Sequence, residues 1–519
     1  FVNGRRIQDP NVLKEGDKIQ CGATTVLRFA LYDEIDERYQ EQLRAAMSSG
    51  FPAAEAPTHV ETDPWSPQSW RTKKLAQAIR YDDERALDAA VERLGSLPPL
   101  VTSWEVEDLK ALIGDAQEGR RFLLQGGDCA ETLADCAPGI ITNKLKILIQ
   151  MSLVLVRGAR RPVIRVGRFA GQYAKPRSRP TEVKNGVELP SFFGDIVNRP
   201  EFEASARRPD PNRLLEGYLH AALTLNFIRA LSAGGFADLR RPDYFDLSFF
   251  ERAELPTGLK VDYARMCREI TDGLHLMQAF GDRSAEELMK VTFYASHEGL
   301  LLPYEAAQTR RVPRRPGFYD LTTHMPWIGE RTRALDGAHI EFFRGIANPV
   351  AVKLGPSSTA EDVIGLARAL NPKNERGKLV FVTRMGAGQV DKSLPPLIEA
   401  ARRRKLRVLW VADPMHGNTI TTKSGRKTRD FDHILQELER SMDVHQAAGS
   451  YLGGVHFELT GEDVTECIGG GLSEADLDQR YETLCDPRLN YRQAIEMAFC
   501  LARRLNETPR PPSTVPPAR

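Results

Sequence analysis

Eight short apolar runs follow one another between residues 121 and 462, and they constrain the fold of this chain more than any other feature. Each run is nearly continuous in apolar residues, as expected for a parallel strand covered on both faces, and most are separated by enough chain for a helix. The runs are RFLLQGGDC, PVIRVGRFAG, KVTFYASHE, FYDLTTHMPWIGE, PVAVKLGP, KLVFVTRMG, RVLWVADPMHG and GGVHFELTGE. Eight βα units of this kind predict an α/β protein built as a (β/α)8 TIM barrel.

The rest of the chain surrounds this barrel with smaller segments. Residues 1–32 alternate in the strand manner and predict a short all-β stub, and residues 33–62 predict a helical connector and linker. The barrel domain then covers residues 63–506, with a helical extension at its N-terminus and a long insertion between strands 2 and 3, at about 179–288. Residues 507–519 are rich in proline, and we expect them to be disordered.

Charge and hydropathy exclude several classes of function. The chain carries 71 Lys and Arg against 70 Asp and Glu, a net charge of +1, so we expect neither a nucleic-acid partner nor a membrane surface. It has no apolar run of about 18 residues and no signal-peptide pattern, which favours a cytoplasmic protein. Its seven cysteines are an odd number scattered over 519 residues, which does not indicate a disulfide scaffold.

Residues of metal-ligand type stand at the ends of three runs. In a barrel the catalytic groups lie at the carboxyl ends of the strands. Cys129, His416 and Glu458 end runs one, seven and eight, and Asp486 follows run eight. This set of sulfur, nitrogen and oxygen donors suits manganese, cobalt, iron or zinc. His297 and His456 compete for the same role, and the alternative is that some of these side chains are only structural.

Basic residues end or follow the intervening runs. They are Arg168, Lys175, Arg177, Arg331, Lys353 and Arg384. So many cations directed into one barrel mouth would repel one another unless anions neutralised them, and phosphate and carboxylate match the geometry of Arg and Lys. The alternative is that these cations are solvated or paired with Glu298, Glu330 and Asp413.

Longer motifs identify a family. They are LLQGGDCAET, RFAGQYAKPRS, YASHE, WIGERTR, DGAHIEFFRGIANPVAVKLGP, DPMHGNT, TGEDVTEC and RYETLCDPRLN. From Trp65 to Arg504 the chain closely resembles class II 3-deoxy-D-arabino-heptulosonate 7-phosphate (DAHP) synthase. The resemblance implies condensation of phosphoenolpyruvate with erythrose 4-phosphate to DAHP and phosphate, the first step of the shikimate pathway. It also implies a divalent metal, with manganese or cobalt expected before zinc or iron.

The resemblance assigns roles to individual residues. The metal ligands would be Cys129, His416, Glu458 and Asp486. Arg168 and Lys175 would meet the carboxylate of phosphoenolpyruvate, and Arg331, Lys353 and Arg384 its phosphate. Arg177 and Ser178 would hold the sugar phosphate, and Glu298, Trp327 and Glu330 would complete the substrate site. Arg168, Glu330 and Lys353 would be the catalytic residues. Cys485 adjoins Asp486, and a reduced thiol there is preferred over a disulfide with Cys129.

Two segments outside these motifs leave other functions open. The stretch FVNGRRI to TTVLRF resembles the last strands of a forkhead-associated (FHA) domain, with Asn3 and Gly4 in its final motif. This supports a rival phosphopeptide-binding function, although the residues of that family that grip phosphothreonine are not among residues 1–32. Residues 240–266, in the long insertion, resemble helices that bind aromatic amino acids or form subunit contacts. We therefore expect a homo-oligomer, a dimer or tetramer, with Trp, Phe or Tyr as candidate effectors.

A further alternative lies within the same barrel group. A related phosphoenolpyruvate-dependent synthase could use a different aldose phosphate, or an amino-sugar variant of it. The long class II motifs favour erythrose 4-phosphate.

Overall fold

The computed structural model describes residues 65–234 and 291–507, parts of a helical segment within 258–272, and two strands near the N-terminus. These two strands, β1 (Lys18–Cys21) and β2 (Thr25–Arg28), pair antiparallel with Lys18 opposite Arg28. The rest of the expected β stub, the connector at 33–62, most of residues 240–266 and the tail after Glu507 lie outside the described residues. The strand pair belongs to a unit made of residues 1–64 and 313–316, and the rest of the chain forms a second unit.

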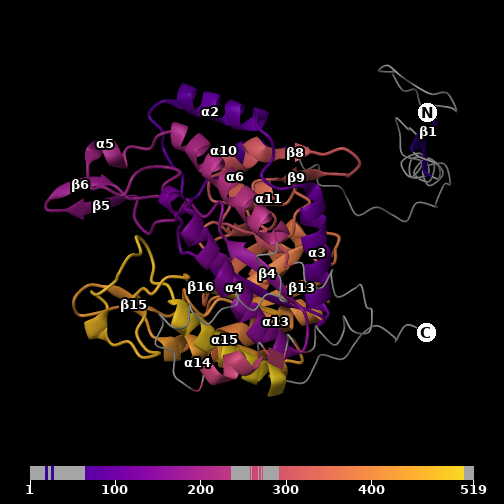
Figure 1. The fold of residues 1–519 in the computed structure, drawn as a ribbon. Coiled ribbons are helices and arrows are strands. Elements are labelled where there is room, and N and C mark those ends of the chain that lie inside the picture. Colours follow the sequence, from indigo (N-terminus) through magenta and orange to yellow (C-terminus); the bar gives the residue numbers. More distant parts are fainter. Residues whose placement is uncertain are drawn as a thin grey trace. The chain divides into compact units, whose positions relative to one another are not determined.

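Eight parallel strands form the centre of the larger unit (Figure 1). They are β3 (Phe122–Gly127), β4 (Val163–Arg168), β7 (Phe293–Ala295), β10 (Trp327–Ile328), β11 (Val350–Leu354), β12 (Leu379–Thr383), β13 (Val408–Ala412) and β16 (Gly454–Glu458). Their order is β10-β11-β12-β13-β16-β3-β4-β7. A parallel bridge between Glu298, just after β7, and Trp327 of β10 joins the two edges. The sheet therefore curls into a barrel, and each predicted run holds one of its strands.

The fourth predicted run differs from the expectation of one long strand. Its first part, β9 (Phe318–Asp320), pairs antiparallel with β8 (Thr309–Arg311), and only Trp327 and Ile328 join the barrel. The buried Asn348 amide accepts from the Asp320 N–H at 2.9 Å and donates to the Asp320 carbonyl at 2.8 Å. The same amide also donates to the carbonyls of Thr323 and His324. Asn348 thus satisfies backbone groups that a longer strand would have paired in a ladder.

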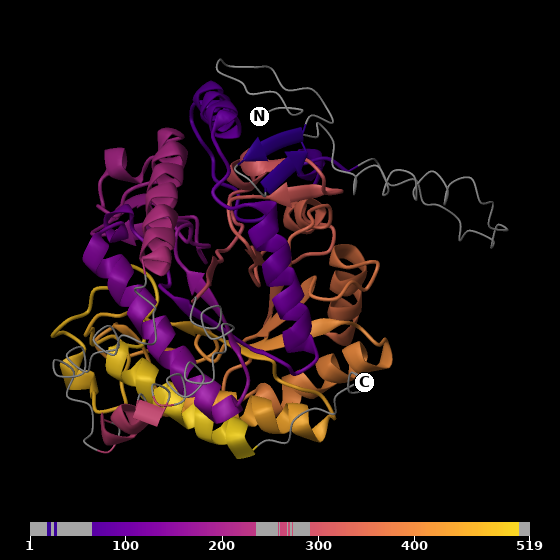
Figure 2. The ribbon, with the colours of Figure 1, turned by 45° about the vertical axis from the view of Figure 1, so that its right-hand side comes forward.

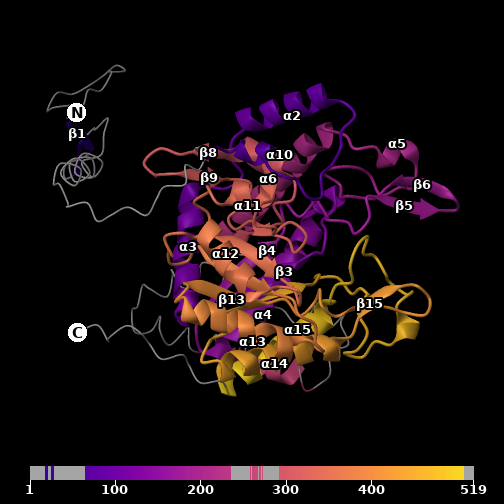
Figure 3. The same ribbon diagram turned by 180° about the vertical axis from the view of Figure 1, so that it is seen from behind.

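Helices cover the outside of the barrel, as Figures 2 and 3 show from two further sides. Those that follow barrel strands are α4 (Pro138–Ala159), α6 (Asn212–Ala233), α10 (Leu302–Gln308), α11 (Ala338–Phe343), α12 (Ala360–Leu370), α13 (Val390–Arg403), α14 (Phe431–Ala447) and α15 (Tyr491–Glu507). Short elements between them are η2 (Leu133–Asp135), α5 (Ala204–Arg207) and η4 (Glu474–Asp476). The main core lies between these helices and the outward faces of the strands.

A helical extension precedes the barrel and closes one of its ends. It consists of η1 (Ser69–Thr72), α2 (Glu84–Ser96) and α3 (Ser103–Gln117). Thr102 and Glu105 form a reciprocal capping box at the start of α3, which fixes where that helix begins. Leu109 and Ile113 of α3 share a buried cluster with inward-facing side chains such as Leu123, near the start of β3. Because α3 occupies the amino ends of the strands, the open end of the barrel is the carboxyl end.

Two hairpins extend from the connections at that open end. β5 (Thr181–Lys184) pairs with β6 (Val187–Pro190), and β14 (Thr419–Thr421) pairs with β15 (Lys427–Arg429). Figures 1 and 3 show both hairpins on the same side of the barrel. Neither hairpin was expected from the sequence, because both lie in connections where we expected only helix or loop.

Among the described helices, α4 alone is long and apolar enough to cross a membrane by composition. Of its most apolar window, 67% is buried inside the fold. Its buried face includes Leu145, Leu148 and Met151, which belong to the main core. The apolar character of α4 is thus explained by its place as a core helix.

The buried His339 of α11 should make the fold sensitive to acid. Its Nε2 lies 3.1 Å from the Leu300 carbonyl, and burial lowers the pKa of His339 to about 4, from an ordinary 6.5. Between these values the unfolded chain binds the proton and the folded chain does not, so stability is complete above pH 6.5 and is lost as the pH falls towards 4. The loss from this group should reach roughly 3 kcal/mol.

His339→Gln keeps a donor for Leu300 and removes the titration. In chemical unfolding at pH 7 and at pH 4.5, this variant should lose less stability than the parent. His433→Gln changes an exposed histidine of α14 and serves as the control. Equal acid sensitivity of the parent and His339→Gln would contradict the expectation.

Candidate active site

The open end of the barrel begins at a glycine. Gly127, the last residue of β3, has a φ of +145°, and a Cβ there would lie 2.7 Å from the Arg168 carbonyl. Glycine is the residue that permits both this backbone conformation and this close approach. The chain then continues into Asp128 and Cys129, which are both buried. Asp128 is fixed by Lys144 at 2.6 Å and by Arg488 at 2.7 Å.

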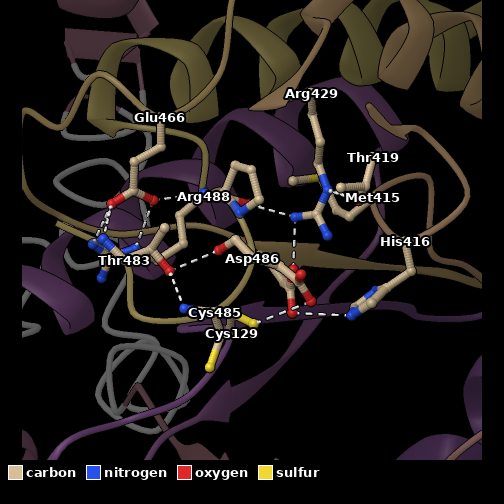
Figure 4. Close-up of polar contacts among 12 residues, drawn as sticks. Cys129, Met415, His416, Thr419, Arg429, Glu466, Thr483, Cys485, Asp486 and Arg488 are labelled. Carbon is tan, nitrogen blue, oxygen red and sulfur yellow. Dashed lines mark hydrogen bonds and ion pairs between the residues drawn. The ribbon is translucent and has the colours of Figure 1, made fainter. Parts of the chain in front are cut away.

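Three of the four expected metal ligands form a compact group. Donor atoms of Cys129, Glu458 and Asp486 all lie within 4.8 Å of one another. Donors bound to one ion at 2.0 to 2.3 Å are separated by at most about 4.6 Å, so the spacing of this group is close to what a single metal ion needs. Figure 4 shows Cys129 and Asp486 directed towards the same point as His416. The combination of thiol and carboxylate donors fits a divalent transition metal.

His416, the fourth expected ligand, lies at the edge of this group. Its Nε2 is 3.0 Å from Glu458 Oε1, and its Nδ1 is 2.7 Å from Asp413 Oδ2. Burial acts to raise the pKa of Asp413, but His416 and Lys353 beside it hold that pKa well below its usual value. An ionised carboxylate on Nδ1 leaves Nε2 as the atom available to a metal, and such a carboxylate–histidine pair is typical of metal sites.

Lys175 contacts two members of the ligand group. Its Nζ lies 2.5 Å from Cys129 Sγ and 2.7 Å from Asp486 Oδ2. Burial acts to lower the pKa of Lys175, but Asp486 and Cys129 raise it well above its usual value. The site therefore favours positive charge at this point, as a metal site must. Cys485 lies beside Cys129, and both are free thiols.

Arg168 is buried beneath the group and is held by several acceptors. Its Nε donates to the Asp128 carbonyl at 2.8 Å, and its Nη2 donates to the Cys129 carbonyl and to Glu458 Oε1, each at 3.0 Å. Its Nη1 lies 2.6 Å from Nε2 of His456. Burial lowers the pKa of His456 well below its usual value, so this partner is neutral. Arg168 thus positions Glu458 while its Nη1 contacts no anion.

The remaining expected cations extend the site outwards. Lys353 Nζ lies 2.9 Å from Asp413 Oδ2 and 5.6 Å from the centre of the Trp327 ring. Arg384 donates to the His416 carbonyl at 2.8 Å. The exposed Arg331 donates to Ser178 Oγ at 2.9 Å. This hydrogen bond connects the segment after β10 with the segment after β4 at the open end of the barrel.

Acidic residues expected to counter these cations do so only in part. Glu330 accepts from the Gly355 N–H at 2.7 Å and from Arg333 at 3.1 Å. Arg177 pairs with Glu182 of β5 at 2.6 Å. Glu298 makes none of these pairs: its Oε1 is buried with no hydrogen-bond partner among the described residues. The alternative interpretation is that Glu298, Glu330 and Asp413 only neutralise the expected cations. Among the described residues, that pairing is found for Asp413 with Lys353 and not for Glu298 or Glu330.

A cavity of about 1040 Å³ opens onto this end of the barrel. Lys175, Arg177, Ser178 and Arg331 line it, together with Asp486 and the β5–β6 hairpin. Its lining thus includes Asp486, one of the three grouped ligands, together with cations of the outer part of the site. A cavity of this volume is typical of a site for a small molecule. Expected metal ligands and expected anion-binding residues thus share one opening.

Comparison with known proteins decides the family. The model of the class-II DAHP synthetase family matches residues 65–502. The chain belongs to the class-II DAHP synthetase family. Relatives named phospho-2-dehydro-3-deoxyheptonate aldolase include one from Streptomyces coelicolor, 47% identical over 446 residues, which cover 86% of this chain and 98% of that protein. One from Neurospora crassa is 44% identical over 456 residues, 84% of this chain and 94% of that protein. One from Mycolicibacterium smegmatis, AroG, is 44% identical over 444 residues, which cover 84% of this chain and 93% of that protein.

The structure adds residues to the site of this class-II DAHP synthetase chain that the sequence did not indicate. Arg429, fully buried at the end of β15, donates to Glu458 Oε2 at 2.6 Å, and Lys427 lies 3.2 Å from Asp486 Oδ1. Both come from the β14–β15 hairpin, which was not expected from the sequence. Arg488 bridges Asp128 and Glu466, each at 2.7 Å, and so fixes the chain beside Asp486. Asp413, which directly follows β13, was expected only as a counter-ion of the cations, and its contact with His416 was not foreseen.

Proposed function

We propose that this chain is a metal-dependent 3-deoxy-7-phosphoheptulonate synthase, which condenses phosphoenolpyruvate with D-erythrose 4-phosphate. The observation that carries the proposal is a group of metal-type donors, one of which, Asp486, lines the same cavity as the cations Lys175, Arg177 and Arg331, in a chain of this family. Two phosphorylated substrates, one also a carboxylate, need the cations, and an aldehyde electrophile needs the metal. The reaction would supply the shikimate pathway, for aromatic amino acids or related secondary metabolites, in the cytoplasm.

The metal would be held by Cys129, His416, Glu458 and Asp486. Its donor set is compatible with manganese or cobalt, which we propose first, and with zinc or iron. When bound, such an ion supplies a Lewis acid that polarises the aldehyde of erythrose 4-phosphate. Arg429 and Arg168 hold Glu458 from two sides, and Asp413 orients His416, so the protein sets the direction of these donors.

The cations would bind the substrates in two groups. Arg168 and Lys175 would meet the carboxylate of phosphoenolpyruvate, for which the Nη1 of Arg168 has only a neutral partner in the structure. Lys353, Arg384 and Arg331 would meet its phosphate. Arg177 and Ser178 would hold the phosphate of the sugar at the outer part of the cavity, and Glu298 and Trp327 would complete the substrate site.

The chemistry then forms two σ bonds to carbon and breaks one, and it uses up the double bonds of phosphoenolpyruvate and of the aldehyde. The methylene carbon of phosphoenolpyruvate bonds to the aldehyde carbon, which leaves positive charge at the carbon that carries the phosphate oxygen. A water molecule positioned by Glu330 adds there, and the resulting adduct releases inorganic phosphate as its carbon–oxygen bond breaks and the water oxygen becomes the ketone oxygen of the product. The two protons of the water end on the former aldehyde oxygen and on the released phosphate. Lys353 and its neighbours stabilise the negative charge on phosphate throughout.

The test is release of phosphate from phosphoenolpyruvate with a panel of aldose phosphates. Erythrose 4-phosphate should give the highest kcat/KM, with ribose 5-phosphate, arabinose 5-phosphate and an amino-sugar phosphate well below it. The product should be confirmed as a seven-carbon sugar acid by mass spectrometry. A higher rate with an amino-sugar phosphate would move the assignment to the related synthase, and no release with any aldose phosphate would refute it.

We also propose the domain division expected from the sequence: a partial FHA-like stub at 1–32, a connector at 33–62, the barrel at 63–506 and a tail at 507–519. A homo-oligomer, a dimer or tetramer, with aromatic amino acids as effectors belongs to the same proposal. It is supported by the aromatic character of residues 240–266. Asn3 and Gly4, on which the rival phosphopeptide-binding function rests, lie outside the described residues, so that function stays an alternative prediction.

Removing residues 1–60 should leave kcat/KM within a few-fold of the parent. No proposed site residue precedes Cys129. Among the described residues, the one nearest the N-terminus that contacts a site residue is Gln77, which accepts from the Arg177 N–H at 2.8 Å. Steady-state kinetics of the shortened chain checks this. The full chain should show no affinity for a phosphothreonine peptide by calorimetry. An inactive shortened enzyme, or measurable peptide binding, would make the stub a functional part.

A further inference from the structure

A second cavity, of about 420 Å³, lies at the end of the barrel opposite the active site. Its walls include Gln117, the last residue of α3, and Val408, the first residue of β13, which place it at the amino ends of the strands. Trp410 on the outward face of β13, Ile398 of α13 and Met442 of α14 give it an apolar interior. A cavity of this size and character is typical of a site for a small molecule.

Arg161 brings an uncompensated charge to this cavity. Its side chain is buried, with 8% exposed, and donates to the carbonyls of Gly119 and Ala159 and to the Tyr451 hydroxyl. All three acceptors are neutral, and none of the carboxylates in the described residues forms an ion pair with Arg161. These bonds engage Nε and Nη1, which leaves Nη2 without a hydrogen-bond partner in the part of the chain that the structure describes. Buried charges in proteins are normally paired, so this guanidinium lacks an anion.

His445 brings an unsatisfied polar atom to the same cavity. Its side chain is 1% exposed, and its Nδ1 lies 3.0 Å from Ser450 Oγ. Its Nε2 has no hydrogen-bond partner among the described residues. The ring packs against Trp410, with centroids 5.6 Å apart, and burial lowers the pKa of His445 to about 3, so the imidazole is neutral. A neutral imidazole with one nitrogen satisfied offers one further hydrogen bond at the other.

We propose that this cavity binds a small organic carboxylate with an apolar body. Arg161 supplies the counter-ion for the carboxylate, the walls around Trp410 take the apolar body, and His445 completes its hydrogen bonding with a polar atom of the ligand. A phosphorylated sugar does not suit the site, because its hydroxyl groups would face the apolar walls. The site is separate from the catalytic cavity, since α3 and the layers of side chains inside the barrel lie between the two ends.

The test uses 3-phenylpropionate as the probe and its neutral amide, 3-phenylpropanamide, as the matched compound. Binding to the full-length, manganese-loaded protein is measured by saturation-transfer NMR and calorimetry, with saturating phosphoenolpyruvate present so that carboxylate sites in the catalytic cavity are occupied. The acid should bind at least tenfold more tightly than the amide. Arg161→Met should weaken binding of the acid at least tenfold and leave binding of the amide nearly unchanged.

Two further variants keep the test decisive. Arg402 also lines the cavity, but its side chain is 61% exposed and pairs with Glu399, so Arg402→Met should change binding less than twofold. Ala401→Leu reduces the volume while keeping both polar groups, and should weaken the acid and the amide alike; it decides the outcome where Arg161→Met does not fold. No binding of the acid at 10 mM in the presence of phosphoenolpyruvate, or equal binding of acid and amide, would overturn the proposal.

Discussion

Cys129→Ala is expected to strip the protein of its divalent metal and to lower turnover on the order of 10³-fold. The thiol is 1% exposed and lies within 4.8 Å of the donor atoms of Glu458 and Asp486, so its loss removes one member of a compact ligand group. The substitution removes a single sulfur atom, and the fold should survive. Metal content by mass spectrometry of the purified protein, together with phosphate release, measures both effects.

Cys136→Ala provides the matched control for this result. Cys136 is a half-buried free thiol whose Sγ lies 3.7 Å from the His220 carbonyl, away from the ligand group. This variant should retain the metal content and the rate of the parent. A Cys129→Ala protein with parental turnover and no bound metal would show that the group does not serve catalysis through a metal.

Lys353→Met should lower kcat/KM by about 3 kcal/mol, roughly 100- to 200-fold, as expected for the loss of one preorganised electrostatic contact. Lys353 is 6% exposed and stands between Asp413 and the Trp327 ring, so its charge is poorly screened by water. Methionine preserves most of the buried alkyl chain and removes only the ammonium group. Steady-state kinetics with each substrate varied in turn measures the loss.

The control here is Lys392→Met, which removes an exposed lysine of α13 by the same substitution. It should leave kcat/KM unchanged. A loss under about fivefold for Lys353→Met would favour the alternative that Lys353 only neutralises Asp413. A melting temperature close to that of the parent separates an effect on catalysis from an effect on folding.

The barrel could be predicted from the sequence because doubly covered strands leave a strong apolar signal. The seven longer strands follow that signal closely. Run four shows its limit: Asn348, a single buried amide far along the chain, diverts part of the run into a hairpin. A side chain that acts across 25 or more residues leaves no local pattern, so the shortening of β10 to two residues could not be foreseen.

The candidate site was predictable where its residues end barrel strands. Cys129, Lys353 and Glu458 follow that rule, and the structure brings them to one end of the barrel. Lys427 and Arg429 do not follow it, because they lie on the β14–β15 hairpin in the connection between β13 and α14. The composition of this hairpin does not indicate that it folds towards the site. The hydrogen bonds from Arg168 to the backbone carbonyls of Asp128 and Cys129 could not be predicted from the sequence either, because they depend on the backbone conformation at Gly127.

The pairing of β3 with β16 has a consequence for how the protein is made. Gly454 of β16 pairs with Leu123 of β3. The strand β16 is therefore synthesised on the order of 300 residues after β3, the barrel strand that it pairs with. At common elongation rates the nascent chain would expose that edge of β3 for roughly half a minute. During this time the apolar β3 strand could pair with other emerging chains. Cys129 would have no contact with Asp486 until nearly the whole chain has been synthesised. Ribosome-associated chaperones should therefore matter more for the yield of this enzyme than its stability once folded would suggest.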